Sequence, residues 1–229
     1  MRLDKFVCKS TQLSKSEAIN CINIGEIIVN GKIITNAATQ VHENNTITLN
    51  GVTLKTRKFR YILMHKPINT ICSNIDEVYP SIFNYLNIEN VSELHIAGRL
   101  DADTTGLILI TDDGRWSFSF TAPSKQCRKV YRVNLSKELK IDVALAFEEG
   151  VQLQGEQQLT LPATLQRVTS TEVLLTITEG KFHQVKRMFA AVGNRVISLH
   201  REKIGDICLD VGVGQWRYLT DDEVQSFAK

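Results

Sequence analysis

The sequence predicts an α+β protein in two parts, a small N-terminal module and a larger domain with a mostly antiparallel or mixed sheet and flanking helices. At 229 residues, of which 43% are hydrophobic, the chain is long enough for this arrangement. From about residue 59 onward, alternating apolar stretches typical of strands outnumber long helical patterns. Neither G-x-x-x-x-G-K nor G-x-G-x-x-G occurs, so nothing indicates a doubly wound nucleotide-binding domain.

The first part of the chain has the pattern of a compact module of helices and hairpins. The segment LDKFV is helix-like, and Ser14 with Glu17 three residues later matches a capping box at the start of a second helix. Gly25 fits the end of that helix. Asn30 and Gly31 stand between two β-branched runs, which is the strongest short signal for a hairpin. The segment NTITLNG supplies a further strand.

The basic segment LKTRKFRY is the predicted linker, so we divide the chain into residues 1–57 and 58–229. The predicted strands of the second part are RYILMHKP, LILIT, VYRVNL, EVLLTIT and RVISLHREKIGDICL. The predicted helices are VALAFEEG and VKRMFAAVG. In the latter, apolar residues recur with helical spacing from Val185 to Val192 and predict a core face. Strands that alternate with few helices favour an antiparallel or mixed sheet over a parallel one.

Charge and cysteine content exclude several classes of protein. Lys and Arg total 27 against 25 Asp and Glu, so composition alone does not predict a nucleic-acid partner. The five cysteines form no C-x-x-C pair, which argues against zinc and against a disulfide framework and favours reduced thiols. The N-terminus lacks the apolar core of a signal peptide, and no apolar run approaches the ~18 residues of a membrane span. We therefore expect a soluble cytoplasmic protein.

The segment HIAGRLDADTTGLILITDDG, residues 95–114, contains four aspartates whose roles differ. DADTT, which begins at Asp101, fits D-x-D-x-T and resembles the haloacid dehalogenase-type phosphatases, which use an aspartate as phosphoryl acceptor and bind Mg²⁺ through carboxylates. However, AGRL interrupts the apolar strand that precedes the pattern in those enzymes. The other three, Asp103, Asp112 and Asp113, fit turns in which aspartate accepts backbone N–H bonds.

Asp101 differs from the other aspartates because Arg99 stands two residues before it. If GRLD is extended, both side chains project to the same side. A nearby guanidinium favours the ionised carboxylate, which a nucleophile or base needs when no metal activates it. A plain surface ion pair has the same spacing, so the residues alone leave a catalytic and a structural interpretation open.

Two resemblances to known families bear on this choice. MRLDKF, LSKSEAINCINIGEIIVNGKIIT and NNTITL resemble the S4 RNA-binding domain. AGRLDADTTGLILITDDG resembles the catalytic motif of the RsuA-type rRNA pseudouridine synthases. LMHKP, CRKVYRV and TEGKFHQVKRMFAAVGNRVISLHREKIG extend that resemblance, in order, over essentially the whole chain. It implies an enzyme that isomerises one uridine of 16S rRNA to pseudouridine, of the type that acts at position 516.

The resemblance also implies roles for individual residues. It places the essential carboxylate on Asp101, the aromatic ring that stacks on the target base on Tyr131, and a basic group beside the carboxylate on Lys186. Related synthases carry arginine in place of Lys186, so the charge is kept without the bidentate geometry. Arg99 is expected to tune Asp101 or to hold the flipped strand. In the S4-like part, the candidate RNA contacts are Lys9, Lys15 and Lys32.

Partners and cofactors follow from the same resemblance. We expect no cofactor and no metal, with His183 and His200 as structural residues or RNA contacts. The expected partner is 16S rRNA within a partly assembled small ribosomal subunit particle, bound by a monomer away from membranes. Three alternatives stay open: the same chemistry on 23S rRNA, an RNA-binding protein without catalysis, and a Mg²⁺-dependent phosphohydrolase. Attack on C1′, attack on C6 and glycal formation also stay open.

Overall fold

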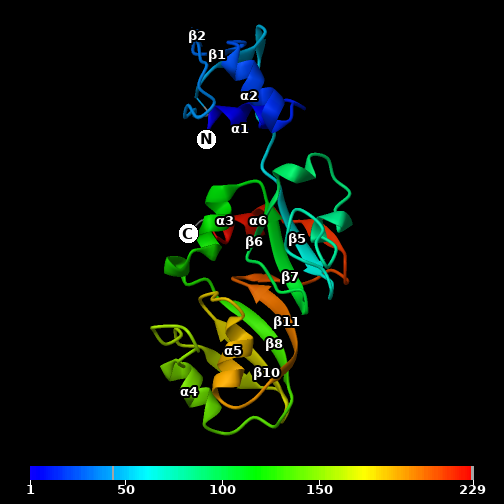
Figure 1. Ribbon diagram of the computed structural model, residues 1–229, viewed down its shortest axis with the longest axis vertical. Helices are drawn as coiled ribbons and strands as arrows, with labels where there is room; N and C mark the ends of the chain where they lie inside the picture. The colour runs from blue at the N-terminus through cyan, green and yellow to red at the C-terminus, as the bar shows by residue number, and fades with distance from the viewer. Residues whose placement is uncertain (43, 228–229) are drawn as a thin grey trace. The chain divides into compact units, whose positions relative to one another are not determined.

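The computed structural model describes residues 1–42 and 44–227, and the chain forms two compact units, Met1–Lys58 and Phe59–Lys229 (Figure 1). The N-terminal unit contains two helices and four short strands: α1 (Leu3–Ser10), α2 (Lys15–Asn23), β1 (Ile27–Val29), β2 (Lys32–Ile33), β3 (Ile47–Leu49) and β4 (Val52–Thr53). The strands lie in the order β2-β1-β3-β4, and the pairs are antiparallel. Buried apolar side chains from both helices and from β1 and β3 form one core.

Local signals in this unit act as the sequence predicts. The Ser14 hydroxyl accepts a bond from the Glu17 amide, while the Glu17 carboxylate accepts one from the Ser14 amide at 2.8 Å, which completes the capping box. Asn30 and Gly31 both have positive φ values, 49° and 79°, as a two-residue type I′ hairpin requires. This turn sets the antiparallel register of β1 and β2.

The larger unit is built on a nine-stranded sheet with helices against it. Its strands are β5 (Tyr61–Lys66), β6 (His95–Ala97), β7 (Thr104–Thr111), β8 (Lys129–Leu135), β9 (Thr164–Arg167), β10 (Glu172–Ile177), β11 (Val196–Ile204), β12 (Ile207–Cys208) and β13 (Trp216–Tyr218). Its α-helices are α3 (Gly114–Thr121), α4 (Val143–Glu149), α5 (Gln184–Ala191) and α6 (Asp221–Gln225). Three 3₁₀ turns are η1 (Ile82–Tyr85), η2 (Val91–Glu93) and η3 (Pro123–Lys125).

The main strand order is β13-β5-β7-β11-β8-β10-β9, with β6 added beside β7 and β12 beside β11. Among the described strands, β7 and β11 pair in parallel and the other neighbours are antiparallel. In Figure 1, β7, β11, β8 and β10 follow one another down the unit, with α5 and α4 beside the lower strands. The sheet is therefore mixed, as the sequence predicts.

Strand β7 is buried on both faces, which explains its continuous apolar run. Leu107 and Leu109 belong to a core that includes residues of α3 and the C-terminal segment, whereas Ile108 and Ile110 belong to a second core that includes residues of α5. Strand β8 instead alternates buried and half-buried residues. Its buried set, which includes Tyr131, faces the second core. These two central strands carry the site described below.

The segment TDDG, predicted as a simple turn, is the start of a helix. The Asp113 carboxylate caps α3 by accepting bonds from the amides of Arg115 and Trp116. The preceding Asp112 accepts a bond from the Arg60 amide and forms an ion pair with the Arg60 side chain at 3.0 Å. Because α3 is rich in aromatic and serine residues, its propensity is weak, and its packing onto the sheet stabilises it instead.

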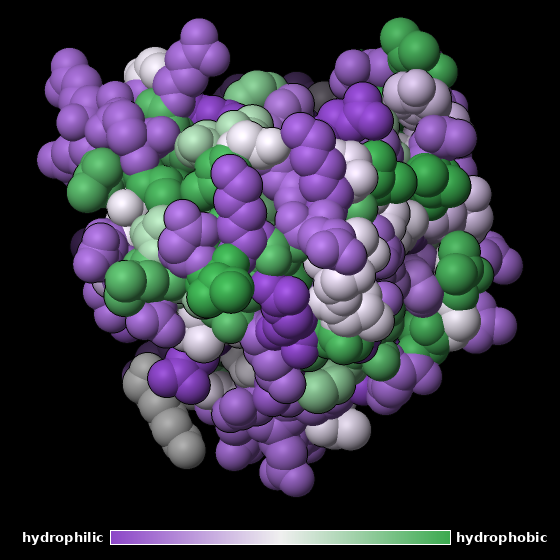
Figure 2. Space-filling model, turned by 90° about the horizontal axis from the view of Figure 1, so that it is seen from below, coloured by the Kyte–Doolittle hydropathy of each residue, from purple (hydrophilic) through white to green (hydrophobic). Residues whose placement is uncertain are grey.

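The face of the molecule shown in Figure 2 is of mixed polarity. Figure 2 views the molecule from the end that carries α4 and shows apolar residues scattered among hydrophilic ones rather than gathered in one broad patch. Within the described residues, no helix is long and apolar enough to cross a membrane.

Candidate active site

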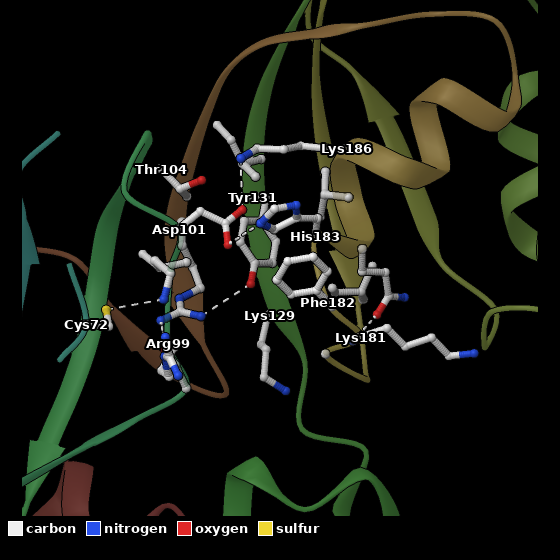
Figure 3. A pocket seen from close by; sticks show the side chains of 18 of the residues that line it. Cys72, Arg99, Asp101, Thr104, Lys129, Tyr131, Lys181, Phe182, His183 and Lys186 are labelled. Carbon is white, nitrogen blue, oxygen red and sulfur yellow. Dashed lines mark hydrogen bonds and ion pairs between the residues drawn. The ribbon is translucent and has the colours of Figure 1, made fainter. Parts of the chain in front are cut away.

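A cavity of about 570 Å³ opens in the larger unit where four segments meet. It is lined by the loop before β7, by the middle of β8, by the turn between β10 and α5, and by β11 (Figure 3). Its volume is within the range of about 300–1,000 Å³ typical of ligand sites. Among the lining residues, Asp101 is the one carboxylate, and five are basic: Arg99, Lys129, Lys181, Lys186 and Arg201.

The Asp101 carboxylate points into this cavity and contacts two side chains from the start of α5 (Figure 3). Lys186 Nζ lies 2.8 Å from Asp101 Oδ2, and His183 Nε2 lies 3.4 Å from Asp101 Oδ1. The side chain of Asp101 is 30% exposed, so a substrate can reach it. The resemblance implies that Lys186 pairs with Asp101 or contacts the target nucleotide, and the structure contains the ion pair.

Lys186 also bridges to a second carboxylate, at 2.6 Å from Asp103 Oδ1. Burial lowers the pKa of Lys186, but hydrogen bonds and charges from Asp101 and Asp103 outweigh it, so the pKa is raised and the ammonium stays charged. Burial acts to raise the pKa of Asp103, but the hydrogen bond and charge of Lys186, together with a backbone hydrogen bond, outweigh it and the pKa is lowered. Asp103 therefore serves the ion-pair network rather than only a turn.

This ammonium bridge bears on the phosphohydrolase alternative. Lys186 Nζ contacts both carboxylates of the D-x-D-x-T pattern, which a magnesium site would need as oxygen ligands. Within the described part of the chain, no group of three or more His, Cys, Asp or Glu residues is arranged to hold a metal. In this structure both aspartates of the pattern are hydrogen-bonded to the Lys186 ammonium.

Arg99 lines the cavity and is exposed, but its predicted pairing with Asp101 is wrong. Among the described residues, Lys186 is the ion-pair partner of Asp101, and the His183 ring lies 3.4 Å from the other carboxylate oxygen. The physical reason is that residues 98–101 are not a regular strand: Gly98 has a φ of 83°, so the two-residue alternation does not apply. Arg99 keeps an open guanidinium at the rim of the cavity.

Tyr131 lies in the cavity wall with 7% of its surface exposed. Its hydroxyl accepts a hydrogen bond from Arg201 Nη1 at 3.3 Å, and the guanidinium carbon lies 5.8 Å from the ring centroid. Arg201 is almost fully buried and comes from β11, where it is the neighbour of Tyr131 across the sheet. Neither its burial nor this contact is visible in the sequence, because arginine is mostly a surface residue.

A buried lysine holds the loop that carries Asp101 in place through hydrogen bonds to its backbone. Lys66 Nζ donates to the carbonyls of Pro67 at 3.0 Å, Ala102 at 3.3 Å and Thr104 at 2.9 Å. Burial lowers the pKa of Lys66. Gly106, with a φ of 113°, lets β11 approach, since an added Cβ would lie 2.3 Å from the Arg201 carbonyl oxygen. These contacts fix Asp101 against β7.

Two site residues were not predicted as such. His183 has a φ of 48°, which is uncommon for a non-glycine residue, and this conformation places its ring beside Asp101. Phe182 stacks on that ring with centroids 3.8 Å apart and is 75% exposed at the edge of the cavity. The signal that could have found them is the segment KFHQVK itself, where both directly precede the helix that carries Lys186. His200 lies elsewhere and bonds to Thr105.

The three lysines predicted to contact RNA differ in exposure. Lys15, at the start of α2, and Lys32, in β2, are exposed. Lys9 is buried, with 7% of its surface exposed, so its ammonium is poorly placed to meet a phosphate. We therefore do not carry Lys9 forward.

Comparison with known proteins places this site in a family. The family described as RNA pseudouridylate synthase matches residues 60–191, and the S4 domain matches residues 1–47. Ribosomal small subunit pseudouridine synthase A of Vibrio cholerae is 47% identical over 231 residues, which cover 100% of both chains. The chain belongs to the RNA pseudouridylate synthase family.

Further relatives agree with this assignment. The pseudouridine synthase of the same name from Escherichia coli strain K12 is 44% identical over 229 residues, covering 99% of each chain. A crystal structure of a pseudouridylate synthase is 40% identical, covers 99% of each chain and superposes with a TM-score of 0.73. The predicted α+β fold, the S4 module and the pseudouridine synthase activity are confirmed. The enzyme is an isomerase, and the phosphohydrolase alternative is set aside.

Proposed function

We propose that this pseudouridine synthase isomerises one uridine of 16S rRNA, the uridine at position 516. The observation that supports the 16S target is full-length identity of 44–47% to enzymes named as small-subunit synthases. The cavity chemistry agrees with an RNA substrate, because its lining holds five basic residues and one carboxylate. An extruded nucleotide would bring a phosphate on each side to this basic rim.

Within this reaction, Asp101 is the essential carboxylate. Lys186 orients the Asp101 carboxylate and neutralises its charge through their 2.8 Å contact. Tyr131 contacts the target base from the cavity wall. Arg99, exposed and without an ion pair to Asp101, binds a phosphate of the flipped strand.

The S4 unit places the RNA. Its exposed lysines, Lys15 and Lys32, contact phosphates without reading sequence. The substrate is a partly assembled small-subunit particle in the cytoplasm, and the enzyme acts as a monomer. No cofactor enters the scheme, because isomerisation neither oxidises the uridine nor adds atoms to it.

The test uses a bacterial strain that lacks its own 16S rRNA pseudouridine synthase. Wild-type chain, Asp101→Asn and the control Asp206→Asn, which changes an exposed aspartate outside the cavity, are expressed there. Carbodiimide treatment and primer extension then map pseudouridine in 16S and 23S rRNA. We expect a stop directly 3′ of position 516 of 16S rRNA with the wild type and the control, and none with Asp101→Asn.

Two outcomes would contradict the proposal. A new pseudouridine in 23S rRNA alone would move the target to the large subunit. Normal modification by Asp101→Asn would remove Asp101 from the chemistry. Purified Asp101→Asn should still bind the RNA, so a binding measurement separates lost catalysis from lost folding. Parallel assays on naked 16S rRNA and on isolated assembly particles identify the form of the substrate.

A further inference from the structure

Arg201 is a buried cation whose partners are neutral. The residue is 1% exposed, and its guanidinium donates to three oxygens: the carbonyl of Leu107 at 2.8 Å, the carbonyl of Gly98 at 2.6 Å and the hydroxyl of Tyr131 at 3.3 Å. Among the described residues, no carboxylate forms an ion pair with it. Burying a charge without a counter-charge is costly. Because Arg201 lines the cavity, we expect the substrate to supply the negative charge that Arg201 lacks in the protein.

The hydrogen-bond directions show how Arg201 can act on that charge. Arginine has donors only, so the Tyr131 oxygen must be the acceptor of the Arg201 bond. The phenolic hydrogen of Tyr131 is then left for another partner, and within the described residues no protein acceptor takes it. Because Tyr131 lines the cavity, that hydrogen is available to a ligand there. A hydroxyl that accepts from a cation is also a stronger donor, because hydrogen bonds in a chain polarise one another.

The same guanidinium connects the Tyr131 hydroxyl to the segment that leads to Asp101. Arg201 Nη2 bonds to the Gly98 carbonyl, three residues before Asp101. The left-handed conformation of Gly98, at φ 83°, turns the chain here, and a Cβ on Gly98 would lie 3.8 Å from Arg201 Nη1. Figure 3 shows Asp101 and Tyr131 side by side, with a guanidinium bonded to the tyrosine hydroxyl. One side chain thus sets the distance between the carboxylate and the phenol.

We propose that Arg201 is a positioning residue that presents the Tyr131 hydroxyl as a donor to a carbonyl oxygen of the target uracil while negative charge develops on that base. The inference rests on the proposed function, since it takes a uridine as substrate. In the isomerisation, the N1–C1′ bond breaks and a C5–C1′ bond forms, the C5 proton is lost and N1 gains a proton. Whether the carboxylate reacts at C1′, at C6 or through a glycal, electron density moves onto the base and its oxygens. A fixed donor aimed at that oxygen stabilises this stage more than the ground state.

A double-mutant cycle tests the proposal. The single-turnover rate is measured by tritium release from RNA labelled at uracil C5, for wild type, Arg201→Lys, Tyr131→Phe and the double variant. The lysine keeps the charge but cannot reach all three acceptors. Arg132→Lys is the matched control, because Arg132 lies in β8 and pairs with Glu172 and Glu202 outside the cavity.

The expected result is non-additive. Arg201→Lys lowers the wild-type rate by about 10- to 100-fold with RNA affinity unchanged within about threefold, and lowers the Tyr131→Phe rate by less than about threefold. Arg132→Lys leaves both rates unchanged. Equal losses in the two backgrounds, or no loss in the wild type, would overturn the proposal, because Arg201 would then act independently of the Tyr131 hydroxyl.

A measurement on the unaltered protein covers the case in which Arg201→Lys does not fold. In a crystal structure of the wild type with uracil or uridine monophosphate, we expect Tyr131 Oη to bridge Arg201 Nη1 and a uracil carbonyl oxygen. Direct contact of the guanidinium with uracil, or a Tyr131 hydroxyl bonded elsewhere, would overturn the proposal. This crystal structure also tests the Arg201 proposal separately from the 16S rRNA target, because it shows the Arg201 contacts whichever rRNA is the substrate.

Discussion

Replacement of Lys66 with methionine removes the ammonium group that links Pro67, at the end of β5, to Ala102 and Thr104, just after Asp101. The side chain is fully buried, and methionine has nearly the same length, so the change removes the donor with little change in volume. The carbonyls of Pro67 and Thr104 lose bonds of 3.0 and 2.9 Å in buried surroundings. The Ala102 carbonyl, at 3.3 Å, is partly accessible, so water can replace its partner.

The expected cost follows from these contacts. A buried acceptor left without a donor costs about 1–3 kcal/mol. The Pro67 carbonyl keeps a bond from the Thr70 hydroxyl at 2.8 Å, so this cost falls on the Thr104 carbonyl. Removing a desolvated ammonium, whose pKa burial lowers, offsets part of this. We expect a net loss of about 1–2 kcal/mol in the free energy of unfolding, together with slower turnover because Ala102 and Thr104 directly follow Asp101 in its loop.

Urea denaturation followed by tryptophan fluorescence measures the first quantity, because Trp116 belongs to the larger unit. Lys140→Met is the matched control, since Lys140 is exposed and its replacement should cost less than about 0.5 kcal/mol. Tritium release at saturating enzyme measures turnover. A cost for Lys66→Met equal to that of the control would refute the reasoning, since the three hydrogen bonds would then contribute nothing net.

Three further predictions concern charge, pH and local stability. Lys186→Met should abolish pseudouridine formation in single-turnover assays while Lys186→Arg retains part of it, because only arginine keeps a cation on Asp101; equal rates would exclude this role. Burial lowers the pKa of His200, so the unfolded state binds its proton more readily and stability falls as the pH drops below about 6.5. Urea titrations from pH 7.5 to 5 should show that His200→Gln flattens this decline, and an unchanged slope would assign it to other groups. Ser14→Ala removes one half of the capping box with Glu17, so α2 should be destabilised by about 0.5–2 kcal/mol. Amide hydrogen exchange measures this loss, and unchanged protection of α2 would mean that the capping box is not formed in solution.

Local signals were readable in the sequence wherever a short-range rule decides the structure. The Ser14 cap and the Asn30-Gly31 turn are examples, because each depends on residues within four positions. Helix α3 was not predicted because long-range packing decides its structure. Its aromatic residues have weak helix propensity, and packing against the sheet stabilises the helix.

The candidate site was predictable only in part. The family motif placed Asp101, Tyr131 and Lys186 around one cavity, and the structure brings them there. The Arg99 pairing failed because it relied on strand alternation in a segment that turns at Gly98. Lys66 and Arg201 could not be identified, since nothing in a sequence tells which basic residues the tertiary structure will bury.

The parallel pairing of β7 with β11 has a consequence for how the enzyme matures. Asp101 and Lys186 are 85 residues apart, and the strand that completes the wall of the cavity follows later still. At about 5–20 residues per second, a ribosome needs about 4–17 s to pass from one to the other. Throughout that interval the nascent chain carries its carboxylate without its ammonium partner. Since such distant strand pairing is also slow to form, this pseudouridine synthase gains its activity only near the end of its own translation.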